Sequence, residues 1–328
     1  MNWTEKTDWS VTDGNINSVC YGNGLYFATT NNGLILKSTD GETWTSKEIV
    51  SEGNIRDICY CGGKRFIAVD SVDAKYYETT DCWETWKTGR LSSAPYGVCY
   101  GNNTAVIVQS WMPIVNTSYI SYKVDGSSTF TGVSVPKSTY KSVCYGNGLF
   151  VAVGSSGIIL TSEDGMTWTQ QTSGVTTNLN SVSYGDGLFV VVGDSETVLI
   201  SWDGITWNQV TFKTGNFYDF CDVTYGYDRF IIVGVGGTIY TFNTDLEWEQ
   251  QNSSVSDQLN GVCYGKAKFV SVGNYGTITI SNKLVESGLY SGIDNEYKFS
   301  EVYVAQDGEY KLCEVYVGQD GEYKLCGG

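Results

Sequence analysis

Short apolar runs alternate with turn-forming residues along most of the chain, and the pattern repeats. In the unit that shows it best, apolar runs span residues 142–145, 149–153, 158–162 and 166–170, and Gly, Asn, Asp and Ser dominate the intervals. Gly, Asn and Asp suit tight β-turns because they adopt a positive φ at little cost. Each unit therefore predicts four short β-strands joined by turns.

A tyrosine, usually within Cys-Tyr-Gly, marks the first strand of each unit. It recurs with spacings of 39, 40, 45, 39, 41 and 39 residues, at Tyr21, Tyr60, Tyr100, Tyr145, Tyr184, Tyr225 and Tyr264. Four strands in about 40 residues is the size of one β-propeller blade, and radial packing of such sheets leaves few exposed edges. We therefore predict an all-β fold in which residues 1–283 form a seven-bladed β-propeller.

The seventh unit lacks a fourth strand, and the N-terminus has one to contribute. No tryptophan-containing strand follows residues 277–281, whereas Trp3 leads into the first unit as Trp44 leads into the second. The sequence thus predicts that residues near Trp3 form the outer strand of the seventh blade and close the ring.

The period changes after residue 283. A 13-residue repeat occupies residues 301–313 and 314–326, and a degenerate copy occupies 288–300. Each copy reads as strand, turn and strand, so residues 284–328 predict a small C-terminal β-meander of three hairpin repeats. Three hairpins bury little apolar surface alone. We expect this module to dock on the propeller or on another chain through Tyr303, Tyr310, Tyr316 and Tyr323.

The composition is acidic, with 36 Asp and Glu against 20 Lys and Arg, and the net charge is −16. This charge repels nucleic-acid backbones and anionic lipid surfaces, so neither is an expected partner. No apolar run approaches 18 residues and no basic-then-apolar leader opens the chain, which predicts synthesis in the cytoplasm without a signal peptide and no membrane insertion. Release is then expected by lysis or within a particle. Most of the ten cysteines occupy one repeated strand position, which indicates core packing rather than disulfides.

The turn between the third and fourth strands carries a recurrent motif, Ser-Thr-Asp-Gly-Glu-Thr-Trp at residues 38–44, with close copies at 162–168 and 201–207. In such a turn the Asp accepts N–H bonds, the Gly adopts a positive φ and the Trp packs between blades. The motif resembles the Asp-box (BNR-like) repeat of sialidase-superfamily propellers. In an active sialidase that resemblance implies an arginine triad, a Tyr/Glu nucleophile pair and an acid/base Asp. The four arginines here do not match the triad, because only Arg56 begins an inner strand.

The sequence contains few combinations of residues that could form a catalytic site. The chain contains no histidine, which excludes Ser-His-Asp catalysis and histidine-based zinc sites, and no metal site or cofactor is predicted. Asp57 and Asp222 occupy equivalent positions, three residues before the repeat tyrosine. They suit either a glycosidase-like carboxylate pair or solvated acids at strand starts, and the second interpretation is favoured. We therefore predict a protein that is not an enzyme.

Binding is better supported, because a rigid ring with variable loops is a scaffold for recognition. The position four residues before the repeat tyrosine differs widely between units and should line one mouth of the central channel. Its occupants are Asn17, Arg56, Tyr96, Lys141, Asn180, Cys221 and Asn260. We predict a polar ligand there, a glycan or a protein loop, with an unoccupied hydrated channel as the alternative. Trp111 and Met112 lengthen the third unit and form either an exposed contact loop or a segment buried against the fourth blade.

The repeats, of which residues 145–154 (YGNGLFVAVG) are typical, also resemble those of propeller proteins in phage tails and phage-tail-like particles of Gram-positive bacteria. That resemblance implies a virion or particle component that recognises a glycan or protein on the host cell surface. Its C-terminal repeats would then attach it to other particle subunits. A passive assembly scaffold and a glycoside-active enzyme of the sialidase-like class are the alternatives.

Overall fold

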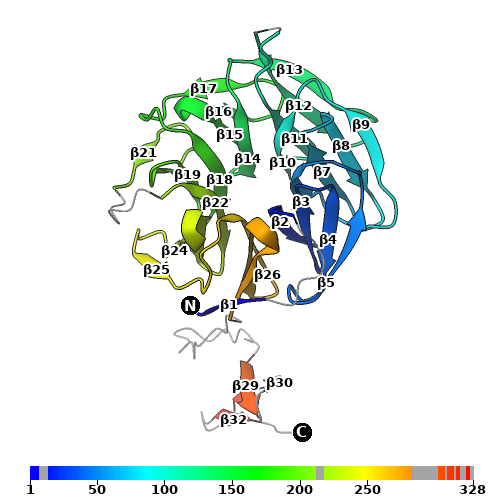
Figure 1. The fold of residues 1–328 in the computed structure, drawn as a ribbon. Helices are drawn as coiled ribbons and strands as arrows, with labels where there is room; N and C mark the ends of the chain where they lie inside the picture. The colour runs from blue at the N-terminus through cyan, green and yellow to red at the C-terminus, as the bar shows by residue number, and fades with distance from the viewer. Residues whose placement is uncertain are drawn as a thin grey trace. The chain divides into compact units, whose positions relative to one another are not determined.

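Seven antiparallel sheets of four strands surround a central channel in the described part of the chain, a seven-bladed β-propeller (Figure 1). The structure is a computed structural model that describes residues 1–6, 14–114, 116–211 and 218–282, together with four short strands after residue 300. The chain divides into two compact units, Met1–Asn282 and Lys283–Gly328. The predicted all-β propeller is confirmed.

Each of the first six blades runs from its inner strand to its outer strand in chain order. Blade one contains β2 (Ile16–Gly22), β3 (Leu25–Thr30), β4 (Leu34–Ser38) and β5 (Trp44–Glu48). Blade two contains β6 (Ile55–Tyr60), β7 (Phe66–Asp70), β8 (Lys75–Thr79) and β9 (Lys87–Arg90). Blade three contains β10 (Pro95–Gly101), β11 (Thr104–Gln109), β12 (Ser118–Val124) and β13 (Thr131–Val135).

Two of the next three blades add a short 3-10 turn between their second and third strands. Blade four contains β14 (Tyr140–Gly146), β15 (Leu149–Gly154), η1 (Ser155–Gly157), β16 (Ile159–Ser162) and β17 (Thr169–Gln171). Blade five contains β18 (Leu179–Gly185), β19 (Leu188–Gly193), β20 (Val198–Ser201) and β21 (Asn208–Gln209). Blade six contains β22 (Phe220–Gly226), β23 (Arg229–Gly234), η2 (Val235–Gly237), β24 (Ile239–Phe242) and β25 (Trp248–Gln251).

The N-terminus closes the ring. Blade seven contains β26 (Leu259–Gly265), β27 (Lys268–Gly273), η3 (Asn274–Gly276) and β28 (Ile278–Ser281), and its outer strand is β1 (Trp3–Glu5). Trp3 pairs with Ser281 in antiparallel register and is 4% exposed. The prediction that residues near Trp3 complete the seventh blade is confirmed.

The second unit contains two hairpins in the residues that the structure describes. β29 (Val302–Gln306) pairs with β30 (Glu309–Cys313), and β31 (Val315–Val317) pairs with β32 (Tyr323–Leu325), each pair as a separate two-stranded sheet. They correspond to the two clear 13-residue repeats. The degenerate copy at 288–300, and the docking predicted for Tyr303, Tyr310, Tyr316 and Tyr323, lie outside what the structure describes.

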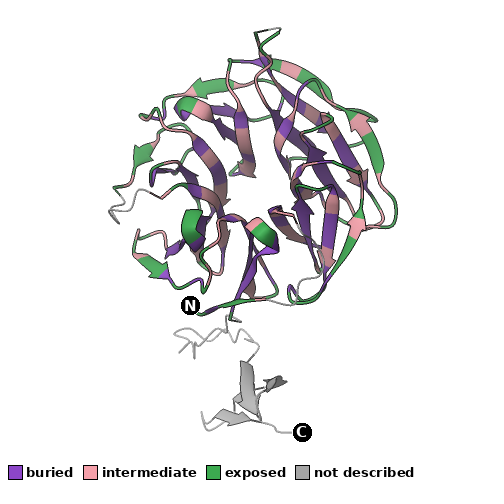
Figure 2. Cartoon of the chain, in the orientation of Figure 1, coloured by how far each residue is buried: buried purple, intermediate pink, exposed green. Residues whose placement is uncertain are grey.

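The core lies between the blades, where the flat faces of neighbouring sheets meet. The second strands are the most buried, and β11 and β19 are buried along their whole length, whereas the outer strands are largely exposed (Figure 2). Each interface combines side chains of two blades: Trp44 of blade one packs with Val270 and Ile280 of blade seven. Burial of both faces explains why the second strands read as continuous apolar runs rather than as alternating ones.

The turns between third and fourth strands have the geometry expected from their sequence. In blade one Asp40 Oδ1 accepts bonds from the backbone N–H of Glu42 and Thr43 at 2.7 and 2.8 Å, and Trp44 Nε1 donates to Gly41 O at 3.0 Å. Gly41 has a φ of +76°. Blades four and five repeat these bonds around Asp164 and Asp203. The backbone N–H bonds from Thr206 and Ile205 lower the pKa of Asp203 to about 2.

The Tyr-Gly pairs are also explained by contacts between blades. The glycine that ends an inner strand lies against the repeat tyrosine of the next blade, so that a β-carbon on Gly146 would approach the ring of Tyr184 to 2.0 Å. The same arrangement occurs at Gly22, Gly101, Gly185, Gly226 and Gly265. Only blade two departs from it, with Cys61 in place of glycine. The repeat dipeptide therefore sets the spacing of the inner strands.

Cysteines in the described residues are free thiols, and burial raises the pKa of Cys144 and Cys263 well above the usual value. These thiols act as small packing groups around the channel. None of the described helical segments has the length and apolar character of a membrane span.

Candidate functional site

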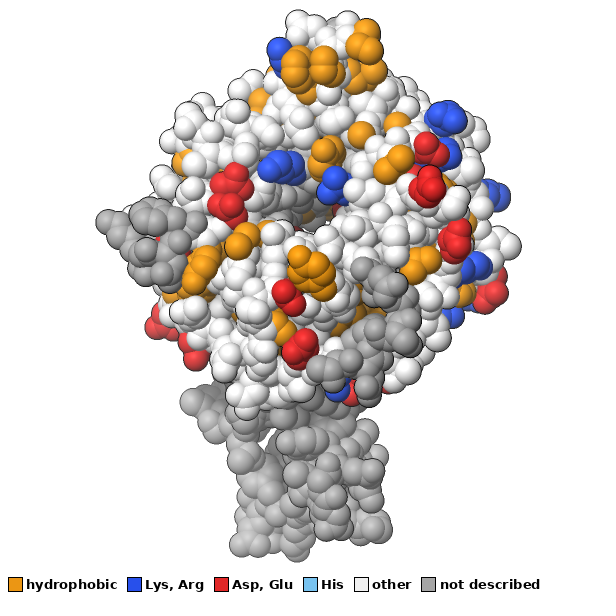
Figure 3. All heavy atoms as spheres, viewed as in Figure 1, with side chains coloured by type: hydrophobic (Ala, Val, Ile, Leu, Met, Phe, Trp, Pro, Cys, Tyr) orange, Lys and Arg blue, Asp and Glu red, His pale blue; other side chains and the backbone are white. Residues whose placement is uncertain are grey.

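The channel opens at the face where the inner strands begin, and a cavity of about 840 Å³ lies there. Figure 3 looks onto this face and shows basic and acidic side chains around the central hollow. The cavity brings together the eight residues predicted to line the mouth, which are Asn17, Arg56, Asp57, Tyr96, Lys141, Asn180, Asp222 and Asn260. Cys221 lies there as well.

A β-bulge places the variable residue of each blade at the mouth. Pairing between the first and second strands skips one residue in every blade, for example between Ile16 and Ser18 in blade one. The skipped residues are Asn17, Arg56, Tyr96, Lys141, Asn180, Cys221 and Asn260. A bulged residue leaves the ladder, so its side chain is redirected without disturbing the paired core. The bulge explains why this position tolerates occupants of such different chemistry.

Three of these residues form hydrogen bonds between neighbouring blades. Asn17, Asn180 and Asn260 each donate a side-chain N–H to the first carbonyl of the next inner strand, at 2.8 Å to Ile55 O, 2.8 Å to Phe220 O and 2.9 Å to Ile16 O. Their amide donors are therefore used within the protein. Arg56, Tyr96 and Lys141 are the bulged residues that bring a positive charge or an aromatic ring to the cavity.

The mouth carries charge of both signs around its circumference. The Arg56 guanidinium lies 5.1 Å from the centroid of the Tyr96 ring, and Lys141 Nζ donates to Asn180 Oδ1 at 2.7 Å. Next along the rim, blades five and six contribute Asp194 and Asp219 to the cavity wall, and Asp194 Oδ1 accepts a bond from Asn180 Nδ2 at 2.7 Å. These two aspartates were not predicted from the sequence. The sequence feature that could have identified them is an acidic residue in a turn or loop close to the start of an inner strand.

Asp57 and Asp222 line the cavity at the starts of their strands, and they also connect blades, a role that the interpretation as solvated acids did not include. Asp57 accepts a bond from Ser18 Oγ of blade one at 2.6 Å and another from Val98 N of blade three at 2.8 Å. Asp222 bridges blades five and seven in the same way, through Ser181 Oγ at 2.6 Å and Val262 N at 2.8 Å. Each carboxylate therefore joins three blades.

These carboxylates make stability depend on pH. Burial raises the pKa of Asp222 to about 7, although its hydrogen bonds act in the opposite direction. A carboxyl whose pKa is higher in the folded state binds protons that the unfolded chain has released, so its contribution to stability is lost as pH rises from about 4 to about 7. We expect the free energy of unfolding to be about 1–2 kcal/mol larger at pH 5.5 than at pH 8 through this group.

The substitution Asp222→Asn should remove most of that pH dependence, as measured by urea unfolding at the two pH values. Asp203→Asn is the matched control, because a pKa of about 2 places its titration below this window. An unchanged slope in Asp222→Asn would contradict the assignment.

The four arginines do not converge on a single site. Arg65 forms ion pairs with Glu78 at 2.7 Å and Asp125 at 2.5 Å, between blades two and three. Arg229 donates to Tyr227 O, and Arg90 ends an outer strand. Arg56 is the arginine that lines the channel. No group of three or more Cys, Asp and Glu side chains suited to a metal ion occurs within the described ranges.

The Trp111 loop connects β11 to β12 and borders a second pocket. Trp111 and Met112 are both half-buried, Met112 forms a β-bridge with Thr117, and Ile114 is 95% exposed. Lys137 Nζ, on the segment that leads to blade four, lies 4.0 Å from the Trp111 ring centroid. The tip of the loop is thus exposed, and its tryptophan packs toward blade four; a contact role for the loop stays a prediction.

Comparison with known proteins supports the fold. Residues 1–129 match the family described as DUF6242 beta propeller domain, that is, 129 of the 328 residues. No curated protein sequence matches the chain.

Solved structures show the same architecture at low sequence identity. YCF48 from Cyanidioschyzon merolae superposes with a TM-score of 0.68 at 16% identity, covering 85% of this chain and 98% of that one. A catalytically inactive histidine-to-alanine variant of virginiamycin B lyase from Staphylococcus aureus, with quinupristin, gives 0.75 at 13% identity, covering 85% and 98%. YCF48 bound to D1 peptide gives 0.68 at 15% identity, covering 85% and 94%. These similarities establish a propeller fold, which is compatible with a binding or structural role.

Proposed function

We propose that this chain is a non-catalytic recognition propeller that binds a polar protein segment across the channel mouth. The observation that carries the proposal is the mixed charge of one cavity, which Arg56 and Lys141 line together with Asp194 and Asp219. A peptide segment carries donors, acceptors and charges of both signs, so it complements such a rim better than a ligand of one charge does. A structural neighbour, YCF48, has been solved with a bound peptide.

Apolar side chains on the same face support a protein partner. Antiparallel pairing returns the turn between the second and third strands to the end of the blade where the inner strand begins. Four such turns expose large apolar residues, which are Val72, Ile114, Val235 and Tyr275, exposed by 62%, 95%, 36% and 80%. Three others, Met166, Trp202 and Ile205, lie at the opposite ends of blades four and five. Exposed apolar side chains on one face favour contact with a protein partner.

The absence of catalysis is part of the proposal. Asp57 and Asp222 hold three blades each, so neither carboxylate is free to serve as a nucleophile. The virginiamycin B lyase that shares the fold is inactivated by loss of a histidine, and this chain contains none.

We further propose that the recognised segment belongs to a host cell surface and that the chain acts in a phage tail or a tail-like particle. The hydrogen-bonded Asp turns of blades one, four and five and the resemblance of the repeats to those of such particles support this. The C-terminal hairpins are then the attachment to the particle. Synthesis in the cytoplasm and release by lysis are part of this proposal.

Retention of the full chain on purified Gram-positive cell walls tests the proposal. We expect the chain to be retained, and we expect the double variant Arg56→Glu/Lys141→Glu to lose at least tenfold in affinity, since it reverses one side of the rim. Lys64→Glu is the control, because Lys64 is exposed at the opposite face. Protease treatment of the walls should abolish retention if the ligand is a protein. No retention of the wild-type chain would favour a passive scaffold, and retention on protease-treated walls would favour a glycan.

A further inference from the structure

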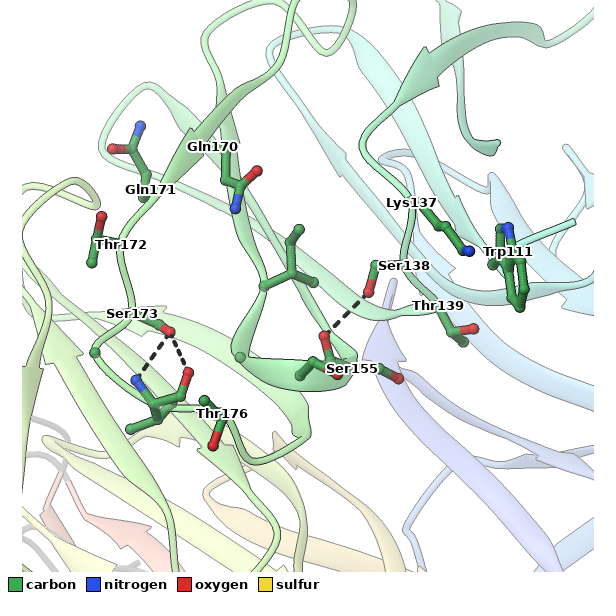
Figure 4. Close-up of a pocket in the computed structure, with 15 residues that line it drawn as sticks. Trp111, Lys137, Ser138, Thr139, Ser155, Gln170, Gln171, Thr172, Ser173 and Thr176 are labelled. Atoms are coloured by element: carbon green, nitrogen blue, oxygen red, sulfur yellow. Dashed lines mark hydrogen bonds between the residues drawn. The ribbon is translucent and has the colours of Figure 1, made fainter. Parts of the chain in front are cut away.

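A second pocket, of about 580 Å³, lies between blades three and four on the same face as the channel. Trp111, Lys137 and Thr139 form one side, the turn at Ser155 forms the floor, and Gln170 to Thr176 form the other side (Figure 4). Its volume falls within the range of small-ligand sites. None of its lining residues lines the channel cavity, so it is a separate site.

The walls of this pocket are held by internal hydrogen bonds. Ser138 Oγ donates to Ser155 O at 3.2 Å, Ser173 Oγ donates to Val175 O at 3.2 Å, and Gln171 Nε2 donates to Thr161 Oγ1 at 2.8 Å. Gly157 has a φ of +72° and lies against Val175 O, where a β-carbon would approach to 2.1 Å. The pocket is therefore formed before any ligand arrives, which reduces the entropic cost of binding.

The remaining polar groups are available to a ligand. Lys137 stacks on Trp111 and has no carboxylate partner within the described part of the chain, unlike Lys75, Lys123 and Lys268. The exposed or half-buried side chains of Thr139, Gln170, Thr172 and Thr176 also line the space. Their amide and hydroxyl groups both donate and accept hydrogen bonds.

The charge of the pocket differs from that of the channel. The channel cavity is lined by Asp57, Asp194, Asp219 and Asp222, whereas the fifteen residues of this pocket include one lysine and no Asp or Glu. A cation surrounded by hydroxyl and amide groups complements a polyhydroxylated ligand with one acidic group. The half-buried Trp111 adds an apolar side chain suited to the C–H face of a sugar ring.

We propose that the pocket between blades three and four binds an anionic sugar, with Lys137 contacting the acidic group and Gln170, Thr139 and Thr172 contacting hydroxyl groups. Trp111 acts as a positioning residue, because its ring holds the Lys137 ammonium at the pocket. This site is independent of the proposed peptide recognition at the channel mouth, since the two share no residue.

Isothermal titration of the full chain with three probes tests the proposal: digalacturonate, glucose 6-phosphate and the neutral disaccharide galactobiose. We expect at least one acidic probe to bind tenfold more tightly than galactobiose, and the comparison of the two acids decides between carboxylate and phosphate. We expect Lys137→Gln and Gln170→Ala each to weaken binding at least fivefold, Lys137→Arg to retain it, and high salt to weaken it. Both variants alter half-buried or exposed surface positions, so unchanged melting temperatures will confirm that they fold.

Arg56→Gln separates this site from the channel and should leave acidic-sugar binding unchanged. Equal affinity for acidic and neutral probes, no effect of Lys137→Gln, or loss of binding in Arg56→Gln would each overturn the proposal. No binding of any probe would overturn it as well.

Discussion

Deletion of residues 1–6 is expected to destabilise the propeller more than any other change considered for this chain. The deletion removes the buried Trp3 side chain and the β1–β28 ladder, together with bonds from Lys6 N to Ile278 O at 3.0 Å and from Asn282 N to Asn2 O at 2.8 Å. Loss of a buried tryptophan alone costs about 3–5 kcal/mol. Deletion also leaves β28 as an unpaired edge strand, which favours association between chains.

Thermal unfolding followed by circular dichroism, with light scattering for association, measures this effect. We expect the melting temperature to fall by about 10 °C or more, because several kcal/mol are lost from a domain of this size. Trp3→Ala should reproduce more than half of the fall. Thr4→Ala, at an exposed position of the same strand, is the matched control and should change stability by less than about 0.5 kcal/mol. A deletion variant as stable as the parent would show that blade seven does not need β1.

Gly146→Ala is expected to lower the free energy of unfolding by about 3 kcal/mol, the upper part of the range for overpacked cores. The new methyl group would lie 2.0 Å from Cγ of Tyr184, so the ring and the inner strand of blade five must move apart. Tyr184 packs in turn on Phe189, with 4.6 Å between ring centroids, so the displacement extends into the core of that blade. Urea unfolding measures the change.

Gly148→Ala is the control for Gly146→Ala, because it lies in the same turn and a β-carbon added there would meet no atom within 4 Å. Its φ of +78° costs an alanine about 1 kcal/mol. The double variant Gly146→Ala/Tyr184→Ala should be less destabilised than the sum of its single changes, since removal of the ring makes room for the methyl group. Strict additivity would show that the clash is not the cause.

The residues at the channel mouth were only partly predictable from the sequence. The position four residues before the repeat tyrosine identified the bulged residues of the mouth, because repetition exposes the places where blades differ. The sequence did not reveal that Asn17, Asn180 and Asn260 donate their amide N–H groups to the next blade. The acceptors of Asn17 and Asn180 lie about 40 residues further along the chain, and the acceptor of Asn260 is Ile16, near the N-terminus. The hydrogen bonds of Asp57 and Asp222 to neighbouring blades also join residues far apart in the sequence, so the sequence did not reveal them either.

The second pocket was hidden for a related reason. Trp111 was notable as an insertion, but Lys137 is an ordinary surface lysine in the sequence, and Gln170 is one of several polar residues on an outer strand. Only the packing of blade three against blade four brings them to one space. A pocket built from four separate segments of the chain has no local signature.

The amino-acid sequence by itself determined the number of blades, the strand order within each blade and the closure by Trp3. These features follow from local rules. Turn-forming residues mark the ends of strands, so the number of strands can be counted from the apolar runs between turns. A blade without an outer strand must obtain one from elsewhere in the chain. The tertiary structure alone decided which polar groups are available to a ligand, because that depends on contacts between blades. It showed that recurrent residues of the repeat hold the ring together, that Arg56, Tyr96 and Lys141 lie at bulges around one cavity, and that Lys137 lines a neighbouring pocket.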